Sequence, residues 1–229
     1  MLSELEGQRD VAWEARLSEG LLTSRVGCPI LAFHEVGSTN DIAKHLAEAG
    51  GPSGLAVIAR NQTAGRGRRG RHWISSPGQS VLMSVVLRTP LLPGESPWLG
   101  LAAGVAVADS LETLGLGRIS IKWPNDILVN GRKIAGILVE PRLGLERLDF
   151  AVLGIGVNVR QRESDWPASL RGLATSCLQE GCDVSLERVA AVILKHLEAC
   201  EDLLLRGEKR LLIERWIGWG GSEELPQLD

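Results

Sequence analysis

The chain has 229 residues, of which 44% are hydrophobic and 23% charged, a balance typical of a globular protein with a sizeable core. It has no apolar run near the roughly 20 residues that a membrane span needs, and its N-terminus lacks the features of a signal peptide. We therefore expect a cytoplasmic protein that does not bind membranes. Four widely spaced cysteines without a C-x-x-C pair predict buried free thiols rather than disulfides or a zinc site.

The N-terminal part of the chain offers no DNA-binding module. Residues 1–27 are mixed in charge and contain scattered leucines, which predicts one or two short helices. The segment is too short for a typical helix-turn-helix domain and is not basic, so we expect no specific DNA binding. The apolar, partly β-branched sequence ILAFHEV at residues 30–36 then predicts the first strand.

A cluster of small polar residues marks the start of the next element. Ser38, Thr39 and Asn40 all favour helix N-caps, and apolar residues at helical spacing follow as far as Gly50. Capping is the common use of these residue types. The alternative is that their side chains and the free backbone N–H groups at this strand-to-helix junction bind a polar or anionic ligand.

The most basic part of the chain follows a second strand, predicted at residues 55–59. The stretch 60–73 reads RNQTAGRGRRGRHW, and no Asp or Glu occurs from residue 49 to residue 94. That acid-free segment carries six arginines while the whole chain has a net charge of −3, so the remainder carries −9. Positive charge concentrated in this way predicts an anionic ligand.

The glycines of this stretch satisfy G-x-G-x-x-G, but the pattern does not indicate a dinucleotide site. No helix follows, and the next acidic residue is Glu95. The β-rich sequence at residues 80–88 instead places the arginines in a glycine-containing loop between strands, where arginine forks can bind phosphate or carboxylate oxygens. An RNA-binding loop stays open as an alternative, with Trp73 as its one stacking surface.

The middle of the chain predicts a buried helix at residues 97–115, a strand at 118–123 and a hairpin with Asn130-Gly131 at its turn. Lys122, Asn125, Asp126 and Lys133 all belong to this neighbourhood. Lysine can neutralise a phosphate and a nearby carboxylate can hold Mg²⁺, although a solvated surface would use the same residue types.

The last third of the chain predicts a buried strand at residues 149–159, in which two glycines permit a ligand or another backbone to pass close by. Helices are expected at 185–205 and 208–217, followed by a frayed tail.

Five motifs, in this order, closely resemble those of the biotin–protein ligases. They are GSTND at 37–41, QTAGRGRRGRHW at 62–73, KWPNDI at 122–127, RKIAGILVE at 132–140 and GIGVNV at 154–159. The resemblance extends over roughly residues 30–216. It implies an α+β fold, a mixed β-sheet flanked by helices, like the catalytic domains of biotin ligases and class II aminoacyl-tRNA synthetases.

The resemblance also implies a two-step reaction with ATP, biotin and Mg²⁺. Biotin's carboxylate attacks the α-phosphate of ATP to give biotinyl-5′-adenylate and pyrophosphate, and a lysine of a biotin carboxyl carrier protein domain then attacks the adenylate. Cationic groups and Mg²⁺ would oppose the repulsion between the carboxylate and the triphosphate. The arginine loop would close over the adenylate and be mobile without it.

Residue roles follow from the same resemblance. Catalytic roles fall to Arg68, Lys122 and Lys133, and a metal contact to Asp126. Biotin contacts fall to Ser38, Thr39, Asn40, Gln62, Arg66, Gly67, Arg68, Trp73, Lys133 and Gly136. Nucleotide contacts fall to Arg68, Arg71, Lys122, Asn125, Asp126 and Asn158.

The expected organisation is an N-terminal extension (1–27), a catalytic domain (28–220) and a tail (221–229). Many relatives carry an N-terminal DNA-binding domain, which we do not expect here, as in the ligase-only class. The family usually also has an SH3-like C-terminal domain, and we do not expect that domain either. Strand-edge dimers occur in the family, so the resemblance allows a homodimer. A lipoate or octanoate ligase and the RNA-binding protein remain alternatives.

Overall fold

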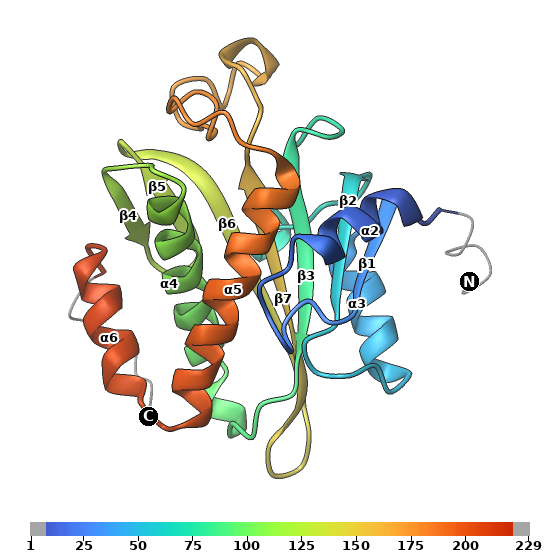
Figure 1. The fold of residues 1–229 in the computed structure, drawn as a ribbon. Helices are drawn as coiled ribbons and strands as arrows, with labels where there is room; N and C mark the ends of the chain where they lie inside the picture. The colour runs from blue at the N-terminus through green and yellow to red at the C-terminus, as the bar shows by residue number, and fades with distance from the viewer. Residues whose placement is uncertain (1–7, 222–229) are drawn as a thin grey trace.

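Seven strands form one mixed sheet in the computed structural model, which describes residues 8–221 (Figure 1). The strand order is β1-β2-β3-β7-β6-β5-β4. The strands are β1 (Ile30–Val36), β2 (Ala56–Gln62), β3 (Ser80–Leu87), β4 (Ile119–Lys122), β5 (Asp126–Val129), β6 (Arg132–Leu143) and β7 (Leu148–Asn158). β1 and β2 are parallel, and the other neighbours are antiparallel.

The helices are α2 (Val11–Glu19), α3 (Thr39–Glu48), α4 (Pro97–Thr113), α5 (Leu186–Leu205) and α6 (Lys209–Gly218). They lie on both faces of the sheet, with α4 and α5 packed together on one face and α3 on the other (Figure 1). A mixed sheet flanked by helices was expected from the sequence, and this fold class is confirmed. None of the helices between residues 8 and 221 combines the length and the apolar character of a membrane span.

Strand β7 shows how one sequence supplies both faces of the sheet. Leu153 and Ile155 belong to the larger core cluster, which α4 and α5 cover, whereas Phe150 and Val152 belong to the smaller cluster under α3. Alternate residues of a strand point to opposite faces, so one apolar face of β7 packs under α4 and α5 and the other packs under α3. This explains why the strand reads as a continuous apolar run.

The predicted elements correspond closely to those of the structure. The N-terminal helix α2 packs on β1 and α5, and its Trp13 and Leu17 belong to the larger core cluster. The expected frayed tail falls mostly on residues 222–229, which lie outside the described range. Residues 1–7, where a further short helix was allowed, lie outside it as well.

The expectation about the cysteines is half right. All four are free thiols, and Cys177 and Cys200 are buried as predicted. Burial raises the pKa of each of these two thiols to about 12. Cys182 is half-buried, and the prediction of burial is wrong for Cys28, which is exposed because it lies in the loop between α2 and β1.

Candidate functional site

A cavity opens on the α3 face of the sheet where the large side chains of β7 give way to glycine. Gly154 and Gly156 continue the face that Phe150 and Val152 occupy nearer the start of the strand. Gly156 is paired directly with Gly136 of β6, and the Trp73 indole lies on the two glycines. A Cβ atom on Gly156 would lie 2.7 Å from that ring, so the glycines make the room that Trp73 occupies.

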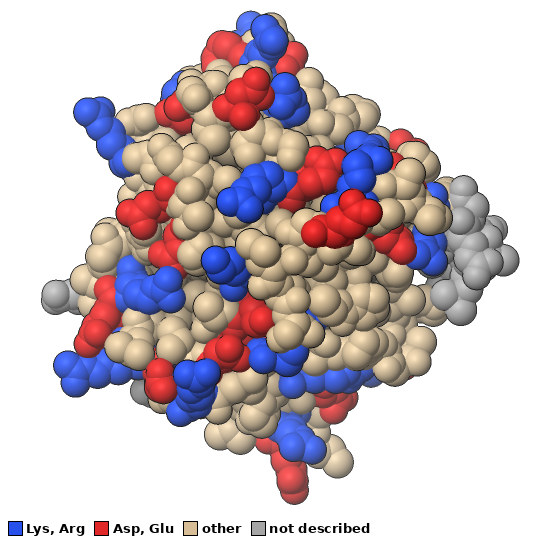
Figure 2. All heavy atoms as spheres, in the orientation of Figure 1, with Lys and Arg blue, Asp and Glu red and all other residues tan. Residues whose placement is uncertain are grey.

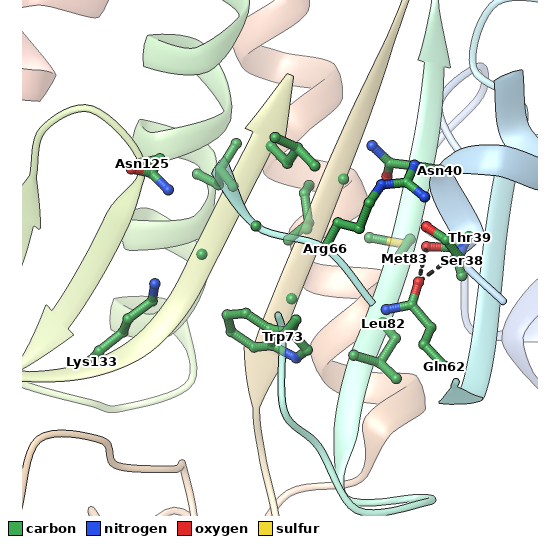
Figure 3. A pocket seen from close by; sticks show the side chains of 17 residues that line it. Ser38, Thr39, Asn40, Gln62, Arg66, Trp73, Leu82, Met83, Asn125 and Lys133 are labelled. Carbon is green, nitrogen blue, oxygen red and sulfur yellow. Dashed lines mark hydrogen bonds between the residues drawn. The ribbon is translucent and has the colours of Figure 1, made fainter. Parts of the chain in front are cut away.

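The polar end of this cavity is formed at the start of α3. Thr39 donates hydrogen bonds to Gln62 Oε1 from its backbone nitrogen (2.7 Å) and from its hydroxyl (3.0 Å). Ser84 Oγ lies 2.7 Å from Thr39 Oγ1 and 2.6 Å from Asn40 Oδ1. Ser38 is the N-cap residue, but its side chain makes no capping hydrogen bond. Figure 3 shows Ser38, Thr39, Asn40 and Gln62 grouped on one side of the cavity. The common use of such residues, capping, is therefore not their use here.

Two carboxylates that lie far away in the sequence reach Arg66. Asp41 accepts two hydrogen bonds from its guanidinium, at 2.7 and 2.6 Å, and Glu140 lies 3.7 Å from Nη2. The hydrogen bonds from Arg66 hold the pKa of the Asp41 carboxyl below its ordinary value, and the same pair raises the pKa of Arg66. Glu140 also accepts a hydrogen bond of 2.8 Å from Asn40. These contacts fix the start of the arginine loop against α3.

The arginine loop, residues 65–73, is a tight hairpin. The Trp73 nitrogen donates to the Gly65 carbonyl at 3.1 Å, and the Gly67 nitrogen donates to the Arg71 carbonyl at 2.7 Å. At the tip, Arg69 and Gly70 both have positive φ, 57° and 71°, as in the two-residue turns that suit β-hairpins. The hairpin presents its arginines next to the cavity.

A second cavity adjoins the first and is cationic. Of the twelve residues that line it, five are Lys or Arg and one, Asp126, is acidic. Gly67, Trp73, Asn125 and Lys133 line both cavities, so they form the junction between them. In Figure 3, Asn125 and Lys133 lie on the side of Trp73 away from the polar cluster. The two cavities together suit a ligand with a neutral polar end and an anionic end.

An irregularity in β6 brings Lys133 to this junction. Asp126 pairs with Gly136 and Ile127 with Ala135, but Leu128 pairs with Lys133, so that β6 has an extra residue, Ile134. In a regular strand, residues 133 and 136 would point to opposite faces. The bulge allows both to line the first cavity, while Ile134 is fully buried in the core.

Lys133 makes close contacts with two other residues of the junction. Its Nζ lies 2.6 Å from Asp126 Oδ1 and 5.6 Å from the centre of the Trp73 ring. The ammonium group is thus held by a carboxylate on one side and by an aromatic face on the other. Residues 8–221 contain no group of three or more His, Cys, Asp or Glu side chains able to hold a metal ion by themselves.

The structure brings together fourteen of the fifteen residues expected at the site. Ser38, Thr39, Asn40, Gln62, Arg66 and Gly136 line the first cavity, Arg68, Arg71, Lys122 and Asp126 line the second, and Gly67, Trp73, Asn125 and Lys133 line both. Asn158 lines neither of them. It is buried, and its side-chain nitrogen donates to the carbonyl of Thr175 at 3.0 Å.

Not all six arginines of the acid-free segment belong to the cationic cavity. Arg60 donates to Asp10 at 2.7 Å and stacks 4.2 Å from the centre of the Trp13 ring. Arg88 donates to three backbone carbonyls at the end of α3 and the start of β7. Both arginines thus have structural roles, and the cationic cavity uses the arginines at 68–71.

The surface charge gives no support to a nucleic-acid-binding role on the face seen in Figure 2. Basic and acidic side chains are interspersed there, and no continuous basic patch forms. A continuous basic patch or stripe is the usual electrostatic signature of a nucleic-acid-binding surface.

Several site residues were missed in the sequence. Leu82 of β3 and Leu138 of β6 line the first cavity, and Arg69 and His72 line the second. Ser84 supports the polar cluster from beneath. Alternation along β6 could have pointed to Leu138, because it lies two residues from the predicted Gly136 on the same face, whereas no predicted site residue lies on β3 to point to Leu82.

Comparisons with known proteins agree with this geometry. The model of the biotin/lipoate A/B protein ligase family matches residues 33–158. The bifunctional ligase/repressor BirA of Bacillus subtilis is 38% identical over 200 residues, which are 85% of this chain and 61% of that protein. The biotin–[acetyl-CoA-carboxylase] ligase of Mycobacterium tuberculosis is 39% identical over 171 residues, 72% of this chain and 61% of that protein. The chain thus spans about three fifths of the length of these two relatives.

Solved structures give the same result. The biotin protein ligase of Aquifex aeolicus in complex with biotin and ATP superposes with a TM-score of 0.67 at 30% identity, over 82% of this chain and 76% of that one. The Leishmania major enzyme in complex with biotinyl-5-AMP gives 0.67 at 31% identity, over 86% and 82%. With a family model that matches more than half of its residues, the chain belongs to the biotin/lipoate A/B protein ligase family.

Proposed function

We propose that this chain is a biotin–protein ligase, which forms biotinyl-5′-adenylate from biotin and ATP and transfers biotin to a lysine of a carrier protein. The observation that carries the proposal is the junction at Trp73 and Lys133, where a mostly neutral cavity meets a cationic one. The relatives support the same reaction, because they are named as biotin ligases and two solved structures hold biotin with ATP or biotinyl-5-AMP.

The first cavity suits biotin. Its polar end offers the hydroxyls of Ser38 and Thr39 and the amides of Asn40 and Gln62, which supply both donors and acceptors for a cyclic urea. Leu82, Leu138 and the Trp73 ring supply an apolar wall for the rest of the molecule. A ligand with its ring at the polar end would direct its carboxylate toward Lys133.

The second cavity suits the phosphates of ATP. When a carboxylate oxygen attacks the α-phosphorus and pyrophosphate leaves, several negative charges meet at the reacting centre. The ammonium of Lys133 lies at the junction where these charges would meet, and Arg68, Arg71 and Lys122 line the phosphate side. Their fixed positive charges would stabilise the transition state more than either separated substrate.

Asp126 is the protein's contribution to a Mg²⁺ site. It is the one carboxylate among the residues that line the cationic cavity. Mg²⁺ is commonly bound by one or two carboxylates together with substrate phosphates and water, so a single aspartate fits an ion that arrives with ATP. When bound, the ion would neutralise phosphate charge and assist the departure of pyrophosphate.

The acceptor we propose is a biotin carboxyl carrier domain, as in the acetyl-CoA carboxylase named for the relatives. The test is to incubate the chain with biotin, Mg-ATP and such a domain, and to locate the modification by mass spectrometry. Biotin on one lysine of the carrier is the expected result. In parallel incubations with lipoate or octanoate, modification by either of them and none by biotin would contradict the proposal.

The alternatives are less well supported. The Mycobacterium tuberculosis relative and a further one from Paracoccus denitrificans are named as biotin–[acetyl-CoA-carboxylase] ligases, which favours biotin over lipoate or octanoate. Arg68 and Arg71 are exposed, so their position alone would permit RNA contact, but the family match and the named relatives favour a ligase.

A further inference from the structure

A segment that follows β7 holds the backbone of Lys133. We call residues 173–180 the strap. The Lys133 nitrogen donates to the Leu173 carbonyl at 2.8 Å, and the Thr175 nitrogen donates to the Lys133 carbonyl at 2.9 Å. The strap thereby takes up the position beside β6 that β7 leaves when it ends at Asn158. Lys133 is held by Leu128 of β5 on one side and by the strap on the other.

Glu180 fastens the strap on both sides of Lys133. Its Oε1 accepts hydrogen bonds from Arg132 Nη2 at 2.7 Å and from Thr175 Oγ1 at 2.6 Å, and its Oε2 accepts one from Asn130 Nδ2 at 2.7 Å. The Glu180 side chain is only 7% exposed. One carboxylate therefore ties the β5–β6 turn to the strap residue that bonds to Lys133.

We infer that Glu180 is a positioning residue for Lys133, acting through the strap and the β5–β6 turn. The bulge at Ile134 interrupts the regular pairing of β6 just where Lys133 must be aimed at the junction, so its direction depends on these added contacts. Removing the carboxylate would leave the hydrogen bonds of Asn130, Arg132 and Thr175 unmade, and the strap would separate more easily from β6. The catalytic part of this inference rests on the proposed function.

The first test measures the strap itself, in the full chain and without substrate. In the Glu180→Ala variant, the Lys133 and Thr175 amides should exchange hydrogen at least about tenfold faster than in the wild type, because local opening becomes easier. The matched control is Asp183→Ala, which removes an exposed ion pair with Arg160 and makes no contact with Lys133. Equal exchange of these two amides in Glu180→Ala and in the wild type would overturn the inference.

The second test measures catalysis by biotin-dependent exchange of labelled pyrophosphate into ATP. A small displacement of a catalytic group can cost about 100-fold, so Glu180→Ala should lower the exchange rate by about 10- to 100-fold. Glu180→Gln keeps the size of the side chain. It can also keep all three hydrogen bonds if the Asn130 side-chain amide flips to present its oxygen, so it should recover most of the rate.

A double-mutant cycle separates positioning from general destabilisation. If Glu180 acts through Lys133, then Glu180→Ala combined with Lys133→Ala should be no slower than Lys133→Ala alone. Losses that multiply would overturn the inference. If the wild type itself shows no biotin-dependent exchange, the ligase proposal fails, and the amide exchange still decides whether Glu180 holds the strap.

Discussion

The pairing of Gly136 with Gly156 shows how one added Cβ atom would remove the space on which the site depends. These residues lie opposite each other on β6 and β7, and Trp73 lies on both. Any larger side chain at either position would occupy the space of the indole ring. The glycines of the GIGVNV motif are thus required by packing at the cavity floor rather than by backbone conformation.

Substitution Gly156→Ala should weaken biotin binding by about tenfold or more. The added methyl would meet the Trp73 ring at 2.7 Å, and overpacking of this kind costs about 1–3 kcal/mol. Isothermal titration of biotin measures the effect. Gly117→Ala is the control, because a Cβ atom there meets nothing within 4 Å. Unchanged affinity in Gly156→Ala would show that Trp73 does not form the biotin site.

The four thiols should differ strongly in reactivity at pH 8. A pKa of about 12 leaves about one in ten thousand of the Cys177 and Cys200 thiols ionised, and both are also buried. Cys28 is exposed and should react first with a disulfide reagent such as DTNB. Fast reaction of Cys177 or Cys200 with DTNB in the folded protein, identified by peptide mapping, would contradict the packing described above.

At the scale of elements, the arginine loop is expected to close over the adenylate as a clasp. Arg68 and Arg71 line the cationic cavity from a hairpin whose start is fixed by the pair of Arg66 with Asp41. The base of the clasp is therefore anchored to α3, while its tip carries the residues that would contact phosphate.

Substitution Arg68→Ala should speed the release of preformed biotinyl-5′-adenylate. Loss of a charge-assisted hydrogen bond costs about 1.5–3 kcal/mol, which corresponds to a rate about 10- to 100-fold faster. A chase with unlabelled biotin and ATP measures the release rate. Arg162→Ala, at an exposed position outside both cavities, is the control. Equal release rates for Arg68→Ala and the wild type would refute the clasp.

Helix α6 supports the site from the other face of the sheet. Trp216 is 2% exposed, and its ring packs edge-on against Trp123, with 5.3 Å between the ring centres. Trp123 precedes the turn with Asn125 and Asp126 and itself lines the cationic cavity. Arg215 and Trp219 fasten the same helix to Asp109 of α4.

Substitution Trp216→Ala should lower the free energy of unfolding by about 3–5 kcal/mol, because it empties a fully packed position. It should also raise the KM for ATP, since Trp123 loses its support. Urea unfolding and initial rates measure the two effects. Leu211→Ala, on an exposed face of the same helix, should change the free energy of unfolding by less than about 0.5 kcal/mol. Equal stability of Trp216→Ala and Leu211→Ala would contradict this account of α6.

At the scale of the whole molecule, local patterns in the sequence predicted the helices and strands better than they predicted the contacts between them. A continuous apolar run was enough to place β7 and helical spacing to place α4, and fourteen of the site residues that the motifs predicted line two adjoining cavities. The bulge at Ile134 was not predictable, because it is defined by pairing with β5.

The roles of paired carboxylates were also out of reach. Asp41 and Glu140 approach Arg66 only after the sheet has formed, so the absence of acids near the arginines in sequence suggested more free positive charge than the fold leaves. Asn158 was expected near the nucleotide; its side-chain nitrogen donates to the carbonyl of Thr175 in the strap, and it lines neither cavity. Its role in nucleotide binding stays a prediction.

The central claim is that the junction at Lys133 activates the carboxylate of biotin with ATP. Biotin-dependent exchange of labelled pyrophosphate into ATP tests it most directly, because it needs neither a carrier protein nor transfer. The wild type and Lys44→Ala, altered at an exposed position on α3, should catalyse exchange at similar rates. Lys133→Ala should lose about 100-fold or more, as expected when a preorganised charge is removed from the reacting centre. Absence of exchange in the wild type, together with no thermal shift on adding biotin, would contradict the claim.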